Sequence, residues 1–96
     1  MSINKMIRQK VIKIMGLAMQ ISPPDRDRET GEPDVFVIYE AHVSWLEVRY
    51  YAHGFGDGSD CTWWSTIWLT SGNTIRKLNE AIKYLEKIKE DLHNEQ

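Results

Sequence analysis

The stretch VFVIYEAHVSWLEVRYY, residues 35–51, decides the fold of this 96-residue chain. It holds two runs rich in β-branched and aromatic residues, 35–39 and 45–51, and such runs favour β-strands. Neither glycine nor proline separates the two runs, so we place a turn near residues 41–44. A hairpin is the preferred interpretation, and one long bent strand is the alternative.

The sequence on either side adds a third strand and two helices. A glycine-rich turn, HGFGDGSDC at 53–61, precedes another apolar run at 62–70, which we predict as a strand. Residues 2–19 and 72–93 place apolar side chains at three- and four-residue steps, as amphipathic helices do. In the first helix Met15 and Met19 widen the apolar stripe, which suggests contact on more than one side.

These elements predict a single α+β domain over residues 1–96. The charged segment 20–34 contains three prolines and is expected to be an exposed loop between the first helix and the sheet at 35–70. The order is then helix, three-stranded antiparallel meander, helix. We expect both helices on one sheet face, because a sheet of three strands is too small to bury both of its faces at a low cost in free energy.

Alternation along the second and third strands predicts which sheet face stays open. Glu47 and Arg49 share a face of the second strand and are costly to bury, so the helices should cover the opposite face. The open face would then display aromatic side chains among polar ones, a composition typical of recognition surfaces. The candidate protein-interaction residues are Trp45, Arg49, Tyr51, Trp64 and Trp68. Alternatively, a helix or the 20–34 loop crosses over and covers them.

Charge is distributed unevenly along the chain, although the net charge is only −2. The first helix carries four bases and no acid. This basic helix, with aromatics that can stack on bases, makes nucleic-acid binding the alternative function. The sheet region is acidic, however, and offers only Arg49 to a phosphate, so protein binding is preferred. The candidate nucleic-acid-binding residues are Lys5, Arg8, Lys10 and Lys13.

Metal-capable and nucleophilic side chains gather in the centre without a recognised spacing. They are His42, His53, Asp57, Asp60 and Cys61. No Cys-x-x-Cys or His-x-x-x-His pair is present, Asp57 and Ser59 lack the distal glutamate of a calcium loop, and the glycine-rich turn lacks the lysine of a phosphate-binding loop. Cys61 paired with His42 or His53 remains a minor catalytic hypothesis. We expect no metal, no cofactor and no enzymatic activity.

Cysteine content and hydropathy bear on the compartment. The only cysteine, Cys61, cannot form an intramolecular disulfide, which favours a reducing cytoplasm. No apolar run approaches the roughly 18 residues of a membrane span, so we expect no membrane association.

The stretch VFVIYEAHVSWLEVRYYAHG, a tryptophan-containing strand and a leucine-rich final helix together resemble small uncharacterised proteins encoded by tailed phages and prophages. The likeness covers roughly residues 35–90; His42 and Val43 match the turn of that family, and Ala41 stands where glycine is more usual. The resemblance implies a bacterial cytoplasmic setting and an accessory role, and assigns no site residues. We therefore expect a non-enzymatic accessory protein that binds a host or phage protein, or pairs with itself as a homodimer, through the aromatic sheet face.

Overall fold

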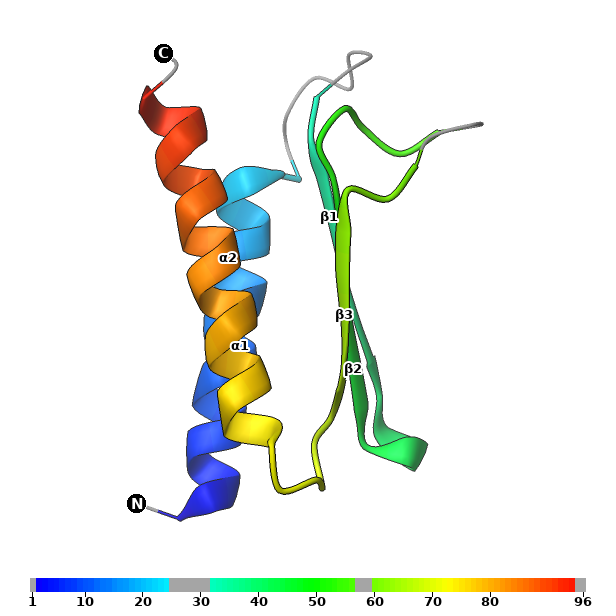
Figure 1. Cartoon of the computed structure of the whole chain (residues 1–96), viewed down its shortest axis with the longest axis vertical. Helices are drawn as coiled ribbons and strands as arrows, with labels where there is room; N and C mark the ends of the chain where they lie inside the picture. The colour runs from blue at the N-terminus through cyan, green and yellow to red at the C-terminus, as the bar shows by residue number, and fades with distance from the viewer. Residues whose placement is uncertain (1, 25–31, 57–59, 95–96) are drawn as a thin grey trace.

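The computed structural model describes residues 2–24, 32–56 and 60–94. Its elements, in chain order, are α1 (Ile3–Ile21), β1 (Asp34–Glu40), a short 3-10 turn η1 (Ala41–Val43), β2 (Trp45–Tyr51), β3 (Trp63–Trp68) and α2 (Thr74–Asn94), as Figure 1 shows. This order confirms the predicted helix, three strands and helix of an α+β fold. Residues 25–31, at the centre of the predicted loop, lie outside the described residues.

The three strands form one antiparallel sheet in the order β1-β2-β3. Val37 pairs with Val48, and Val48 pairs with Ser65, at the middle of the sheet. The predicted turn between the first two strands is confirmed. Ser44 closes it in the left-handed conformation at φ 51°, and its N–H donates to the carbonyl of Ala41 at 3.2 Å.

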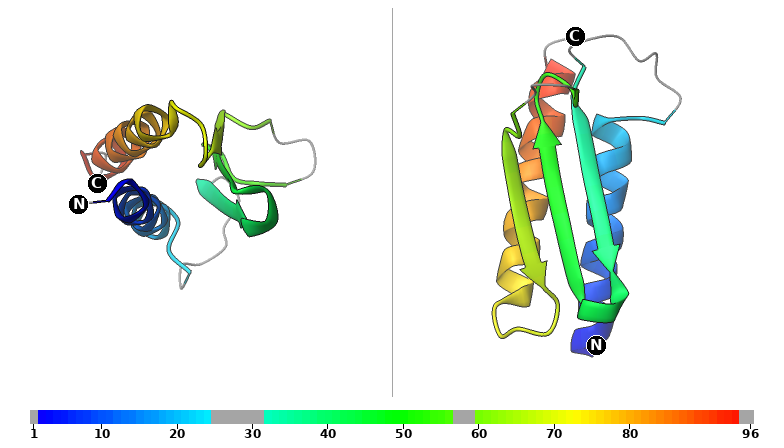
Figure 2. Two further views of the ribbon diagram at one scale, coloured as in Figure 1. Left: turned by 90° about the horizontal axis from the view of Figure 1, so that it is seen from below. Right: turned by 90° about the vertical axis from the view of Figure 1, so that its right-hand side faces the viewer.

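Both helices pack on the same face of the sheet, as predicted (Figures 1 and 2). They run parallel to each other, and Lys10 Nζ on α1 donates to Asn79 Oδ1 on α2 at 2.6 Å. The apolar core fills the space between the helical layer and the sheet, and burial of its side chains is the main force that holds the two layers together. The fully buried large side chains are Ile14, Leu46, Val48, Ile67, Leu78 and Leu85.

The N-terminal end of each helix is fixed by side-chain hydrogen bonds. Ser2 Oγ accepts the backbone N–H of Lys5 at 3.2 Å and caps α1. At the start of α2 the hydroxyl of Thr74 lies 2.7 Å from the carbonyl oxygen of Trp68, so the first residue of the helix contacts the last residue of β3. Neither helix, over its described residues, is apolar enough along its length to cross a lipid bilayer.

Candidate functional site: the outer face of the sheet

The sheet face that points away from both helices is the candidate site, and the right-hand view of Figure 2 looks onto it. Because side chains alternate along a strand, and Leu46, Val48 and Ile67 lie under the helices, their neighbours in sequence point outward. We call this surface the outer face. The pairing register assigns to it Phe36 and Ile38 of β1, Trp45, Glu47, Arg49 and Tyr51 of β2, and Trp64, Thr66 and Trp68 of β3.

Three tryptophans dominate the β2–β3 half of the outer face. The side chain of Trp64 is 63% exposed and that of Trp68 is 51% exposed. Trp45 lies opposite Trp68 on the neighbouring strand and is half-buried. Its indole Nε1 is inaccessible to solvent and has no hydrogen-bond partner among the described residues. Exposed tryptophan in this amount is unusual on a small domain and marks a surface suited to association.

A charge pair neutralises the centre of this surface. The guanidinium of Arg49 lies 2.6 Å from a carboxylate oxygen of Glu47, two residues away on the same strand. The hydrogen bond to Glu47 raises the pKa of Arg49, and a second hydrogen bond to Tyr51 adds to the effect. Arg49 is therefore held by groups of its own strand, and it pairs in register with Trp64.

One predicted site residue is not displayed. Tyr51 does point to the outer face, but its side chain is only 6% exposed, so the expectation that it lies open on this surface is wrong. The ring of Phe36 packs against it at 5.4 Å between centroids, and the ring of Phe55 packs at 5.2 Å. Phe55 follows β2 and is held there by its N–H, which donates to Asp34 Oδ2 at 2.8 Å.

Phe55 is the site residue that sequence reasoning missed. Its ring is largely exposed and lies 5.0 Å from that of Phe36. It sits in the glycine-rich turn, where no periodicity assigns a face to a side chain. The only available signal is the presence of a large aromatic between two glycines, Gly54 and Gly56.

The basic residues of the nucleic-acid alternative lie on α1, in the helical layer behind the sheet. Lys10 donates to Asn79, and Lys13 pairs with Glu86 at 3.5 Å, so both are engaged with α2. Lys5 and Arg8 are exposed and have no ion pair within the described part of the chain. The fold does not bring these cations together with the outward-facing tryptophans.

The metal-capable residues are likewise not assembled into a site. Across residues 2–24, 32–56 and 60–94, no three His, Cys, Asp or Glu side chains gather closely enough to hold an ion. Asp57 and Ser59 lie outside the described residues. The thiol of Cys61 donates to the carbonyl of Trp63 at 3.2 Å and approaches that of Tyr50 at 3.7 Å. His42, in the turn after β1, and His53, near the start of the β2–β3 connection, are exposed.

Comparison with known proteins leaves the outer face to be interpreted from its own geometry. No protein-family model, curated protein or solved structure matches this chain.

Proposed function

We propose that this chain is a non-enzymatic protein-interaction module that binds another protein through the outer face. The observation that carries the proposal is the exposure of Trp64 and Trp68 on a sheet face that neither helix covers. Aromatic side chains bury about 150–250 Å² each, and tryptophan is among the residues that most often dominate binding energy at protein interfaces.

The surroundings of the two indoles suit a protein surface. Ile38 adds aliphatic area on the β1 side, and the Glu47–Arg49 pair supplies hydrogen-bonding groups without net charge. Exposed apolar area with paired polar groups beside it resembles the composition of non-obligate interfaces. A second copy of the chain is one possible partner, since two-fold pairing of identical faces closes an assembly at two subunits.

The nucleic-acid alternative has less support. Affinity for nucleic acid depends on several cations that meet successive phosphates. On the outer face Arg49 is held by Glu47, and the cations of α1 belong to the opposite layer. A nucleic acid with a base stacked on the outward-facing tryptophans would therefore have to extend around the domain before its phosphates met the cations of α1.

Two separate arguments support a bacterial cytoplasmic setting for the proposed function. The resemblance of residues 35–90 to phage and prophage proteins favours an accessory role in a bacterial cell. The lone, half-buried Cys61 suits a reducing cytoplasm, where no disulfide is needed for stability.

The test compares the wild-type chain with the double variant Trp64→Lys/Trp68→Lys, using Ile3→Lys as a matched control on an exposed apolar residue of α1. Light scattering after size exclusion measures self-association. Affinity capture from bacterial lysate, followed by purification of each enriched protein and titration against the chain, measures direct binding. We expect a purified partner, or a second copy, to bind wild type and Ile3→Lys alike and to lose at least tenfold in affinity for the double variant. Equal binding by all three folded proteins, or no direct binding, would overturn the proposal.

A further inference from the structure

Helix α1 carries a second apolar stripe that the fold leaves uncovered. Its core stripe is buried against the sheet and α2. On another side of the same helix Ile12, Met15 and Met19 follow one another at three- and four-residue steps, with side chains 69%, 43% and 52% exposed. A surface helix normally keeps one apolar face, so a second face points to something that packs there.

The stripe approaches β1 at Ile12, which lines one groove together with Tyr39 of β1. In the right-hand view of Figure 2, α1 lies behind β1 and extends past it on the side away from β2. Tyr39 of β1 is also largely exposed on this side. A groove of about 590 Å³ opens here between α1 and the end of the sheet, lined by apolar side chains that include Ile7, Val11 and Leu69.

Hydrogen-bond alternation shows which backbone groups of β1 are unpaired. The N–H of Leu69 donates to the carbonyl of Ser44 at 2.8 Å, in register with the β2–β3 ladder. Alternate residues of an antiparallel strand turn their N–H and C=O groups to opposite neighbours, so the pairing register leaves the backbone groups of Val35, Val37 and Tyr39 facing away from β2. No hydrogen bond to the backbone N–H or C=O groups of Val35, Val37 and Tyr39 is found among the described residues.

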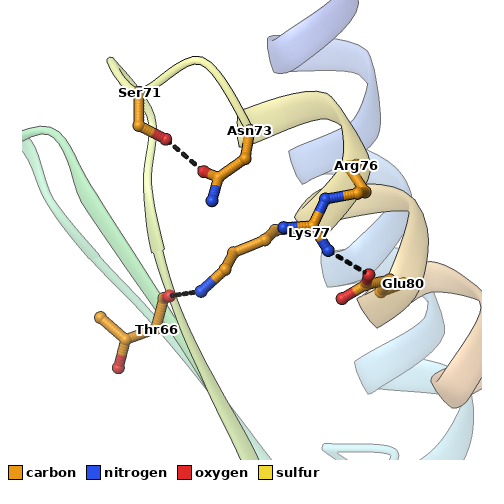
Figure 3. Close-up of polar contacts among 6 residues, drawn as sticks. All are labelled: Thr66, Ser71, Asn73, Arg76, Lys77 and Glu80. Carbon is orange, nitrogen blue, oxygen red and sulfur yellow. Dashed lines mark hydrogen bonds and ion pairs between the residues drawn. The ribbon is translucent and has the colours of Figure 1, made fainter.

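Side chains of α2 contact the opposite edge of the sheet, and Figure 3 shows Lys77 reaching the backbone of Thr66. On β3 the outward carbonyls belong to Trp64, Thr66 and Trp68. Lys77 Nζ lies 3.5 Å from the carbonyl oxygen of Thr66, and the hydroxyl of Thr74 lies 2.7 Å from that of Trp68. Side chains laid across a strand edge prevent further pairing. Of the two edges, β1 is therefore the one open to another strand.

The dimensions of the two layers agree with one missing strand. Two packed helices span about 20 Å, because each is about 10 Å across. Three strands at about 4.8 Å spacing span about 14 Å, and four span about 19 Å. A fourth strand beside β1 would lie over the part of α1 that carries Ile12, Met15 and Met19.

We propose that an extended segment of a partner protein adds to the edge of β1 as a fourth strand. Its backbone would pair with Val35, Val37 and Tyr39, and every second side chain would pack on the uncovered stripe of α1. Those side chains should be apolar, and a large one would fill the groove next to Tyr39. Glu40 has no ion pair among the described residues. We therefore expect a lysine or arginine opposite it, among the partner side chains that point away from α1.

A second copy of this chain fits the edge less well. If two β1 edges paired, each copy would bring a helical layer wider than its own sheet, and the two α1 helices would collide. Asp34 and Glu40 would also oppose carboxylates of the second copy in a pairing centred on Val37. The inference does not use Trp64 or Trp68, which lie on β3 at the far edge of the outer face.

The test selects ligands for the full chain from a display library of random dodecapeptides. We expect enrichment of peptides in which apolar residues alternate and a basic residue recurs. Affinity should fall at least tenfold in Ile12→Lys/Met19→Lys and stay unchanged in Trp64→Lys/Trp68→Lys. Both variants replace exposed side chains, and circular dichroism checks that each is folded.

Amide hydrogen exchange then reports the binding mode. With a selected peptide at saturation, the amides of Val35, Val37 and Tyr39 should exchange at least tenfold more slowly than in the free chain. Peptides that bind the α1 variant as tightly as wild type, protection elsewhere than at β1, or a library that yields no binder would overturn the inference. Because the readouts are separate, loss of the outer-face function leaves this result unaffected.

Discussion

The indole rings of Trp45 and Trp68 stack across the β2–β3 pair, with centroids 5.9 Å apart and planes 18° from parallel. Trp68 is the more exposed member of this pair, and Trp45 is half-buried. Trp68 thus exposes apolar area on the outer face and packs against a neighbour whose buried Nε1 has no hydrogen-bond acceptor among the described residues.

Replacing Trp68 by alanine should uncover Trp45. We expect the indole N–H of Trp45 to exchange with solvent at least tenfold faster, and the free energy of unfolding to fall by about 1 kcal/mol, as for the loss of one aromatic pair. NMR of the indole N–H signals and urea denaturation measure the two effects. Trp64→Ala is the control, because Trp64 pairs with Arg49 rather than Trp45. Slow exchange at Trp45 in Trp68→Ala would contradict the shielding.

Truncation of two isoleucines of α1 should change the free energy of unfolding by very different amounts. Ile14 is fully buried in the core, whereas Ile12 is mostly exposed. Ile14→Ala should lower the free energy of unfolding by about 2–5 kcal/mol, since it removes buried methyl groups and leaves a cavity. Ile12→Ala should change it by less than about 0.5 kcal/mol. Urea titration of both variants checks this, and similar losses at the two sites would refute the assignment of the helix faces.

Thr74 joins the end of β3 to the start of α2. It is almost fully buried, and its hydroxyl lies 2.7 Å and 2.8 Å from the carbonyl oxygens of Trp68 and Ser71. Thr74→Val keeps the shape but leaves both carbonyls without this donor, so we expect a loss of about 1–3 kcal/mol in thermal or urea unfolding. Thr74→Ser retains the hydroxyl and should lose clearly less. If serine and valine were equally destabilising, the hydroxyl would not be the stabilising group.

The sequence predicted the elements in which apolar residues recur at a regular spacing. Alternation in β2 and β3 placed Leu46, Val48 and Ile67 under the helices, and the buried side chains agree. β1 has no such alternation, because Val35 to Tyr39 are all apolar, and its faces follow only from the pairing with β2. The turn between β1 and β2 was located by elimination, and Ser44 adopts the left-handed backbone there without the help of a glycine.

Tertiary contacts that follow no sequence period explain the failures. Tyr51 is covered by Phe55, and that packing depends on a loop whose conformation has no sequence period. Met15 and Met19 widen the predicted apolar stripe of the first helix, yet both are exposed, because they lie on a side of α1 that neither the sheet nor α2 covers. The width of a sheet is a property of the assembled fold, and a helix sequence alone does not contain it.

Tyr84 gives the fold a dependence on alkaline pH. Its ring stacks on Trp63 with centroids 4.2 Å apart, and burial raises its pKa above the usual 10.0, with a smaller contribution from Cys61. The folded state thus favours the protonated phenol more than the unfolded state does. The contribution to stability is fully present below about pH 10 and is lost as the pH rises through the pKa of the folded state.

The free energy of unfolding should therefore decline above about pH 10 more steeply in wild type than in Tyr84→Phe, which keeps the stacked ring but cannot ionise. Urea denaturation at several alkaline pH values measures the slopes. Tyr39→Phe serves as the control, since Tyr39 is largely exposed and its replacement should leave the wild-type slope in place. Parallel slopes for wild type and Tyr84→Phe would show that the phenol of Tyr84 ionises as freely in the folded chain as in the unfolded one.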